Sequence, residues 1–144
     1  MSQPVLNQLN LIVRDMDTTV AFYRRLGLAI NAEPGANHVA VDFPNGLLVE
    51  FDTVDFVRQW DAASTGATGG STVLGFSVPT RKEVDELHGS LTSAGYADHQ
   101  RPYDAFWGAR YAIVEDPDRN CVGIMSPIDD ARKAWPPKPP PGLP

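Results

Sequence analysis

The sequence predicts an α+β fold made of two tandem modules, each with a strand, a helix and three further strands. Two internal repeats lead to this prediction. Residues 9–15 (LNLIVRD) are echoed by residues 74–80 (LGFSVPT), 65 positions later (from 9 to 74). Residues 42–50 (DFPNGLLVE) are echoed by residues 115–123 (EDPDRNCVG), 73 positions later (from 42 to 115). In both halves, a run of alternating apolar residues is followed by apolar residues at helical spacing, which predicts a strand and then a helix. The same order in both halves indicates a repeated structural unit.

The strands of the first module, about residues 5–52, follow from hydrophobic alternation. Over residues 5–13 apolar and polar side chains alternate, so Gln8 is expected on the face that is opposite to the apolar one. Two shorter strands are expected around residues 38–43 and 46–51. The segment PNG between them has the composition of a hairpin turn.

Each module also contains one predicted helix with recognisable ends. In the first, Asp15 or Asp17 is the candidate N-cap and Gly27 ends the helix. In the second, the segment TRKE beginning at Thr80 forms a capping box, and Gly95 closes the helix. These signals place one amphipathic helix after the first strand of each module.

The remaining segments complete the predicted organisation. The second module covers about residues 72–127, with strands expected at 73–78, near 97–101, at 110–114 and at 120–125. Residues 53–71 are a linker that begins with a helical turn, and residues 1–127 form one domain. Residues 128–144 are a Pro-rich tail that is expected to be extended, either as a strap across a partner subunit or as a solvated terminus.

Composition limits the classes of function. A chain of 144 residues that is 42% hydrophobic buries roughly 70% of its unfolded surface as one domain. A net charge of −6 argues against nucleic acid as a partner and is compatible with neutral or cationic small molecules. The single Cys121 cannot form an internal disulfide, and no signal peptide or membrane span is recognised. We therefore expect a cytoplasmic protein.

Several segments together resemble a known family. The helix end AFYRRLG, the segment WGARY at residues 107–111 and the turn DPDRN at residues 116–120 are similar to the vicinal oxygen chelate superfamily. That superfamily contains glyoxalase I, extradiol dioxygenases, fosfomycin-modifying enzymes and bleomycin resistance proteins. The resemblance covers about residues 5–127. It implies that two βαβββ modules curve their sheets into a cup-shaped binding site, and that the protein is a homodimer.

The same resemblance identifies four positions where metal-dependent members place ligands. Transferred by position, they are Gln8 and Glu50 in the first module and Val73 and Gly123 in the second. Gln8 and Glu50 have metal-binding side chains, whereas Val73 and Gly123 do not. Because a catalytic zinc normally needs three protein ligands, this set predicts that no metal cofactor is bound. The alternative is a divalent metal held by Gln8, Glu50 and a third ligand such as His38.

A metal-free cup resembles that of the bleomycin-resistance type, which binds a drug without chemistry. Aromatic side chains suit a planar or cationic ligand, and an unbranched thioether adapts to its shape. The expected ligand-binding residues are Trp107, Phe106, Trp60, Tyr111, His38, Gln8, Glu50 and Met125. At Gly123 the missing side chain is expected to leave room for a bulky ligand. No catalytic residue is assigned.

Other chemistry is not favoured by the pattern of reactive residues. Cys121 is not surrounded by the motif of a catalytic nucleophile. His88 is expected on the surface of the second helix, and His99 in a loop. Asp116 and Asp118 fit a structural turn better than a pair of catalytic carboxylates.

The sequence thus favours a metal-independent protein that binds an aromatic or hydrophobic compound, such as an antibiotic, in the cup. A metal-dependent lyase, isomerase or dioxygenase is the alternative. A third is an interaction module whose cup is filled by its own side chains.

Overall fold

The structure is a computed structural model, which describes residues 2–138 and residue 140. The chain divides into two compact units, Met1–Gly70 and Ser71–Pro144, and each is considered by itself. The first unit contains, in order, β1 (Gln8–Val13), α1 (Met16–Leu26), β2 (His38–Asp42), β3 (Leu48–Thr53) and α2 (Val54–Val57). The second contains β4 (Val73–Ser77), α3 (Arg81–Ser93), β5 (Asp98–Asp104), β6 (Arg110–Glu115), β7 (Cys121–Met125) and the 3-10 turn η1 (Asp130–Arg132). This α+β composition, with one sheet in each unit, confirms the predicted fold class.

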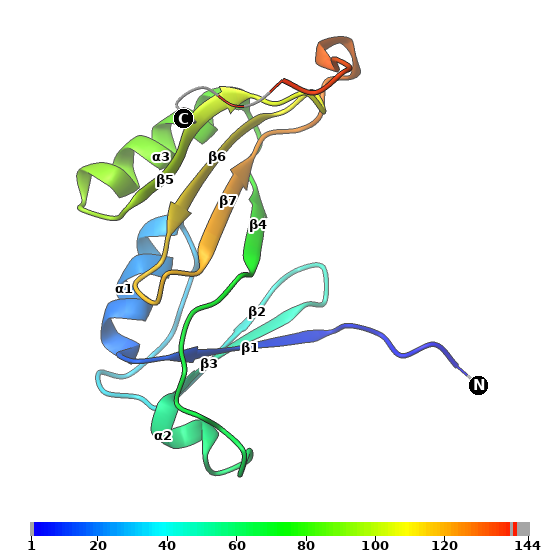
Figure 1. The fold of residues 1–144 in the computed structure, drawn as a ribbon. Helices are drawn as coiled ribbons and strands as arrows, with labels where there is room; N and C mark the ends of the chain where they lie inside the picture. Colours follow the sequence, from blue (N-terminus) through cyan, green and yellow to red (C-terminus); the bar gives the residue numbers. More distant parts are fainter. Residues whose placement is uncertain (1, 139, 141–144) are drawn as a thin grey trace. The chain divides into compact units, whose positions relative to one another are not determined.

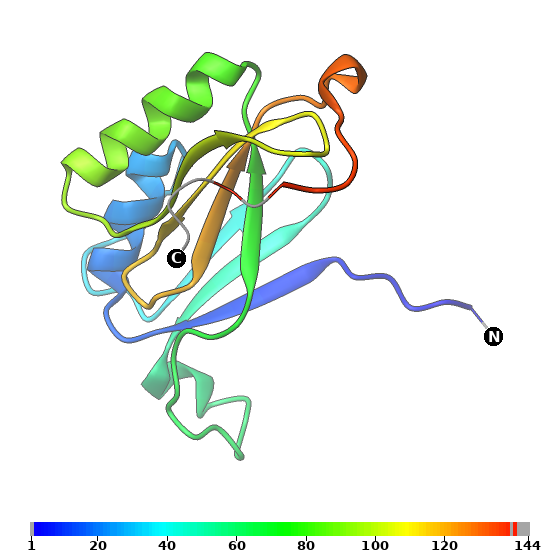
Figure 2. The same ribbon diagram turned by 45° about the horizontal axis from the view of Figure 1, so that its top comes forward.

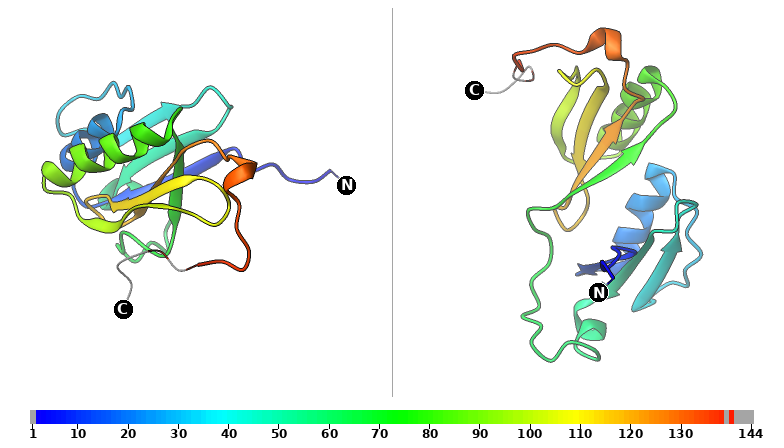
Figure 3. Two further views of the ribbon diagram at one scale, coloured as in Figure 1. Left: turned by 90° about the horizontal axis from the view of Figure 1, so that it is seen from above. Right: turned by 90° about the vertical axis from the view of Figure 1, so that its right-hand side faces the viewer.

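The sheet of the first unit has the strand order β1-β3-β2, with α1 against one face (Figure 3). Strands β1 and β3 are parallel, and strands β2 and β3 are antiparallel. Glu50 on β3 lies between Asn10 on β1 and Ala40 on β2. Because side chains alternate along a strand, Val49 and Phe51 point to the helix, and both are buried. Glu50 therefore faces away from the helix.

Helix α1 has the ends that its sequence predicts. Asp15 is the N-cap, since its side chain accepts a hydrogen bond from the backbone N–H of Thr18 at 3.0 Å. Gly27 ends the helix with φ of 121°, a backbone conformation that residues with a Cβ rarely adopt. The helix buries Tyr23 against the sheet, where its ring lies 4.9 Å from that of Phe51. This contact joins the helix to the central strand β3.

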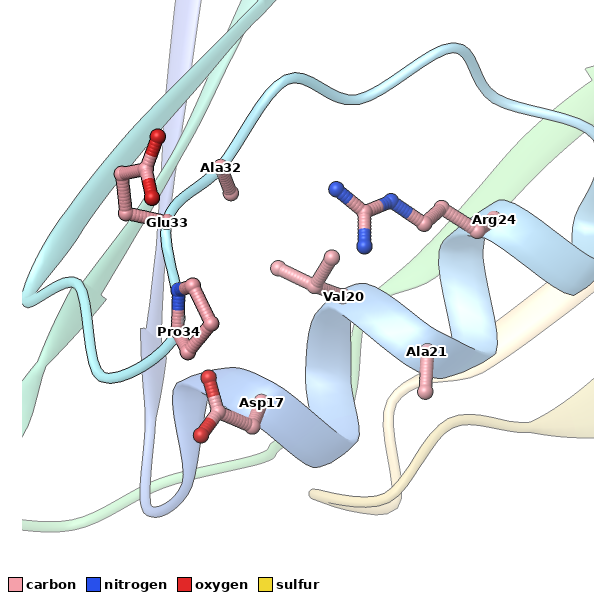
Figure 4. A pocket seen from close by; sticks show the side chains of 7 residues that line it. All are labelled: Asp17, Val20, Ala21, Arg24, Ala32, Glu33 and Pro34. Carbon is pink, nitrogen blue, oxygen red and sulfur yellow. The ribbon is translucent and has the colours of Figure 1, made fainter.

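The described residues of the first unit form three strands, one fewer than the predicted βαβββ pattern. The segment between α1 and β2 is a loop that is fastened to the helix. The Arg24 guanidinium donates two hydrogen bonds to the carbonyl of Ile30, at 3.1 and 2.8 Å, and the Asp17 carboxylate accepts one from the backbone N–H of Gly35 at 2.9 Å. A hollow of 220 Å³ lies between helix and loop (Figure 4). These side-chain bonds take the place of a strand ladder.

The four strands of the second unit lie side by side in the order β4-β7-β6-β5, with α3 on one face (Figures 1 and 2). This unit contains the complete βαβββ module. Thr80 is the N-cap, since its hydroxyl accepts from the Glu83 backbone N–H at 3.2 Å. The same hydroxyl donates to the Glu83 carboxylate at 2.8 Å, whereas the predicted capping box has this carboxylate accept from a backbone N–H. Val84 and Leu91 on α3 are fully buried and form the helix side of the core.

The histidines of the second unit differ from what the sequence predicts. His88 was expected on the surface of the helix, but it is 8% exposed, and its Nε2 atom lies 2.8 Å from the Asp98 carboxylate. A helical position that faces a neighbouring strand buries the ring, and the carboxylate satisfies its polar nitrogen. His99 lies within β5 and not in a loop.

The predicted turn before β7 is confirmed. Asp116 Oδ1 accepts hydrogen bonds from the backbone N–H groups of Asp118 and Asn120, both at 2.9 Å, and its Oδ2 accepts from the Asn120 side-chain amide at 2.9 Å. Asp116 is thus a structural residue that closes the β6–β7 hairpin.

The C-terminal segment begins with the short η1 turn and continues to Trp135, which is 81% exposed. The end of the predicted Pro-rich tail, residues 139 and 141–144, lies outside the described residues. No described helix is long and apolar enough to cross a membrane.

Candidate functional site

Five polar side chains meet on the face of the first sheet that lies opposite α1. They are Gln8 and Asn10 from β1, His38 from β2, and Glu50 and Asp52 from β3, and we call them the polar cluster. The strand register places Asn10 beside Glu50 and His38 beside Asp52. All five occupy alternate positions of their strands, so they share one face.

The polar cluster is held together by hydrogen bonds between its members. The Gln8 amide donates to Glu50 Oε2 at 3.2 Å, and the Asn10 amide donates to the same oxygen at 2.9 Å. Asn10 also donates to Asp52 Oδ2 at 2.9 Å. The Asn10 amide therefore links the Glu50 and Asp52 carboxylates, which would otherwise repel each other.

His38 supplies the one ring of the polar cluster, and contacts with Asp52 and Phe56 hold this ring in place. Its Nδ1 atom lies 2.5 Å from Asp52 Oδ1, and the Asp52 side chain is fully buried while that of His38 is 37% exposed. The ring also packs on Phe56 of α2, with a centroid distance of 5.0 Å. Helix α2 is positioned for this contact because Thr53 caps it through the Phe56 backbone N–H.

The donor chemistry can be compared with what a metal ion requires. Of the four family positions, Val73 has a hydrocarbon side chain and Gly123 has none. The structure adds one possibility that the sequence did not, because ligand atoms of His38, Glu50 and Asp52 lie within 4.8 Å of one another. However, two ligands of one zinc ion are about 2.9–3.4 Å apart, whereas His38 and Asp52 approach to 2.5 Å, which is a hydrogen-bond contact.

The amide of Asn10 also argues against a cation at this place. Its nitrogen donates to both carboxylates, so N–H groups point toward the oxygens that a metal would need. The Gln8 amide does the same at Glu50. These side chains satisfy one another, and they do not fit a catalytic metal site with three free donors and an open position.

In the second unit, aromatic side chains gather on the sheet face opposite α3. This aromatic surface consists of Tyr103, Phe106, Trp107 and Tyr111, together with Met125. Tyr103 and Tyr111 are partners across β5 and β6, and Met125 is the partner of Tyr111 on β7. Phe106 and Trp107 belong to the turn between β5 and β6. All five side chains are half-buried.

The rings pack edge to face, which is a favourable arrangement for aromatic pairs. Trp107 lies 5.2 Å from Phe106 and 5.3 Å from Tyr111, and Tyr103 lies 6.4 Å from Tyr111. The indole Nε1–H of Trp107 donates to the Met125 sulfur at 3.3 Å. Burial raises the pKa of the Tyr111 phenol, with further contributions from Tyr103 and Cys121, so this ring is neutral at ordinary pH.

Gly123 has a different role from the one expected. A Cβ at this position would lie 2.5 Å from the Tyr111 hydroxyl, so the space beside Gly123 is filled by the protein's own phenol ring. Its neighbour across the β4–β7 pair, Gly75, would have nothing within 4 Å of an added Cβ. The absence of a side chain at Gly123 therefore positions Tyr111 within the aromatic surface.

Two apolar hollows border this aromatic surface. One, of 330 Å³, is lined by Phe106, Trp107, Lys133, Ala134 and Trp135. The other, of 490 Å³, is lined by Ser77, Val78, Pro79, Met125, Ser126, Pro127 and Ile128. Trp107 belongs to the first hollow and Met125 to the second, and these two side chains are hydrogen-bonded to each other.

The structure groups most of the predicted site residues, each within its own unit. Phe106, Trp107, Tyr111 and Met125 come together in the second unit, while Gln8, His38 and Glu50 come together in the first. Trp60 follows α2 and is 54% exposed, and within the described residues no ring contact joins it to either group.

Two members of the polar cluster, Asn10 and Asp52, were not predicted from the sequence. Strand alternation contained a signal for both, since each lies two residues from a predicted site residue, Asn10 from Gln8 and Asp52 from Glu50.

Comparison with known proteins identifies the family. The sequence matches the model of the Glyoxalase/Bleomycin resistance protein/Dioxygenase superfamily over residues 5–124. The chain belongs to this superfamily. It is 30% identical over 126 residues to the uncharacterized protein YraH of Bacillus subtilis (strain 168), and the alignment covers 83% of this chain and 95% of that protein.

Solved structures of the Glyoxalase/Bleomycin resistance protein/Dioxygenase superfamily are similar in fold. A glyoxalase-related enzyme from Fulvimarina pelagi has a TM-score of 0.75 at 22% identity, covering 88% of this chain and 89% of that one. A glyoxalase/bleomycin resistance protein/dioxygenase family enzyme from Burkholderia phytofirmans PsJN has a TM-score of 0.71 at 25% identity, covering 84% and 97%. Because this fold hosts unrelated chemistries, the function has to be argued from the side chains.

Proposed function

We propose that this protein binds a small aromatic or otherwise hydrophobic molecule without a metal ion, and that the aromatic surface of the second unit makes the main contacts. The observation that carries the proposal is the group of half-buried rings around Trp107, which is bordered by apolar hollows. Pockets for small molecules are mostly apolar, with a few polar groups.

The chemistry of the aromatic surface favours planar and cationic ligands. Aromatic stacking contributes about 0.5–1.5 kcal/mol beyond the burial of apolar area, and a ring face attracts a cation. The net charge of −6 adds a long-range preference for cations. Antibiotics with planar or cationic groups belong to this chemical class. Sequestration of such a compound requires no catalytic residue.

The proposal includes a cytoplasmic homodimer, as the sequence leads us to expect. Val5 and Leu6 are 81% and 77% exposed, and Trp135 is 81% exposed. In a homodimer these side chains are candidates for burial in the interface. Neither a nucleic acid nor a membrane is proposed as a partner.

The proposal can be tested with N-methylquinolinium, a planar aromatic cation that has no O–H or N–H donor. Replacing Trp107 with Ala removes the stacking contribution and about 100 Å² of apolar contact, or roughly 3 kcal/mol in total. We therefore expect the dissociation constant measured by titration calorimetry to rise about 100-fold. Trp107→Phe is the matched control, because it keeps a ring and should keep most of the affinity. Equal affinity of the wild-type protein and Trp107→Ala would contradict the proposal.

A second candidate function is a metal-dependent lyase, isomerase or dioxygenase that uses Gln8, Glu50 and His38. One observation favours it, namely the proximity of His38, Glu50 and Asp52. The hydrogen bonds of Asn10 and the 2.5 Å contact between His38 and Asp52 favour the metal-free candidate instead. The enzyme would lose all activity in Glu50→Ala and after chelation, whereas the binding protein would keep its fold in Glu50→Ala.

A further inference from the structure

We propose that His38 and Asp52 form a hydrogen-bond-accepting dyad, in which Nε2 of His38 binds the hydroxyl group of a neutral phenol on the open face of the first unit. This proposal concerns the first unit alone, and it does not depend on the aromatic surface of the second. In it, His38 contacts the ligand and Asp52 is a positioning residue.

The carboxylate of Asp52 is placed to fix the state of the ring. Its side chain is fully buried, with Oδ1 at 2.5 Å from His38 Nδ1. Its second oxygen accepts from the Asn10 amide at 2.9 Å, which prevents the carboxylate from turning away. A carboxylate only accepts hydrogen bonds when it is ionised, so the proton of this contact belongs to Nδ1.

The other nitrogen of the same ring is then available to a ligand. In a neutral imidazole, one nitrogen donates and the other accepts, so a proton on Nδ1 makes Nε2 an acceptor. Among the described residues, Nε2 of His38 has no hydrogen-bond partner, and the side chain is 37% exposed. Phe56 packs on the ring and restricts its rotation. The acceptor therefore has a fixed direction before a ligand arrives.

The charges around the dyad select the class of ligand. Glu50 and Asp52 lie on β3, and Asp55 on α2 is paired with Arg58 at 3.2 Å. A carboxylic acid ligand would be an anion at neutral pH, with no proton to donate and with repulsion from these groups. A neutral hydroxyl avoids that repulsion, and phenols are the stronger donors among neutral hydroxyl compounds.

The state of the ring can be measured directly. Long-range ¹⁵N–¹H correlation NMR on the full chain at pH 7.5 should show Nδ1 of His38 carrying the proton and Nε2 without one. In Asp52→Asn, the Asn10 bond holds the new carbonyl oxygen, so the new amide N–H₂ faces Nδ1. We expect the tautomer to invert, with the proton on Nε2. A proton on Nε2 in the wild-type protein would overturn the proposal.

The ligand class is tested with phenol and its methyl ether, anisole, which has the same ring without the donor. One hydrogen bond is expected to make phenol bind about fivefold to tenfold more tightly, as judged by NMR shifts of β2 and β3 residues. His38→Gln and Asp52→Asn should both lose this preference, whereas the control His99→Gln should keep it. The affinity is read from β2 and β3 residues, which separates this proposal from binding at the aromatic surface. Equal affinity for phenol and anisole, or an absence of shifts in β2 and β3, would overturn it.

Discussion

Replacing Gly123 with Ala tests how the aromatic surface is built. The new Cβ would lie 2.5 Å from the Tyr111 hydroxyl oxygen and 3.1 Å from two of its ring carbons, so the ring has to swing away. The displaced ring loses its edge contact with Trp107, worth about 0.5–1.5 kcal/mol. Because the clashing atoms are the far end of a half-buried side chain, the ring can move and the cost of overpacking stays near the low end, about 1 kcal/mol. Gly75→Ala is the matched control, because its Cβ meets nothing within 4 Å on the neighbouring strand.

We expect Gly75→Ala to be neutral or to stabilise the fold by up to about 1 kcal/mol, since alanine restricts the unfolded chain. Gly123→Ala should then be less stable than Gly75→Ala by about 1–3 kcal/mol. With an m-value of about 2 kcal/mol per molar urea, its unfolding midpoint should be lower by about 0.5–1.5 M. Near-UV circular dichroism should report the change around Trp107 and Tyr111. Equal midpoints and unchanged near-UV spectra for the two variants would show that Tyr111 does not occupy this space.

Three further predictions concern the second unit. Asp116→Ala should destabilise the fold by about 2–4 kcal/mol in urea unfolding, because it leaves two backbone N–H groups and the Asn120 amide without their acceptor. A change below about 0.5 kcal/mol would contradict the structural role of Asp116 in the turn. Burial raises the pKa of Tyr111 in the folded state, so its contribution to stability is complete below pH 10 and is lost as the pH rises through the folded pKa. Tyr111→Phe should therefore lose less stability than the wild-type protein between pH 9 and 12, and identical pH profiles would argue against a raised pKa of the Tyr111 phenol. Burial, and then the charges of Glu115 and Asp116, also raise the pKa of the Cys121 thiol. Its alkylation by iodoacetamide at pH 8 should therefore be slower than that of glutathione, and an equal rate would contradict a raised thiol pKa.

The elements that follow from local rules could be predicted from the sequence. Both helix caps, Asp15 and Thr80, were recognisable because capping involves residues within four positions of each other. The alternation of apolar residues along β1 also predicted that Gln8 lies on the polar face, because side chains of a strand alternate between its two faces. Asp52 was not predicted as a site residue, because the predicted strand ended at residue 51, whereas β3 extends to Thr53.

Features that depend on long-range packing could not be predicted in this way. The contact between Gly123 and Tyr111 joins two strands through side-chain packing that sequence spacing does not encode. The burial of His88 depends on its contact with Asp98 in another element. In the first unit, the bonds from Arg24 and Asp17 to the following loop replace a strand, although the βαβββ pattern predicted one. In each case the outcome depends on a side-chain contact between two elements, or between a helix and a loop, that local patterns do not encode.

The measurement that tests metal-independent binding most directly is the affinity for N-methylquinolinium before and after dialysis against EDTA. Metal content should be determined on the same samples of untagged protein by elemental mass spectrometry. We predict an unchanged dissociation constant and no divalent metal in stoichiometric amount. About one metal ion per chain, together with loss of binding after chelation, would contradict the proposed function.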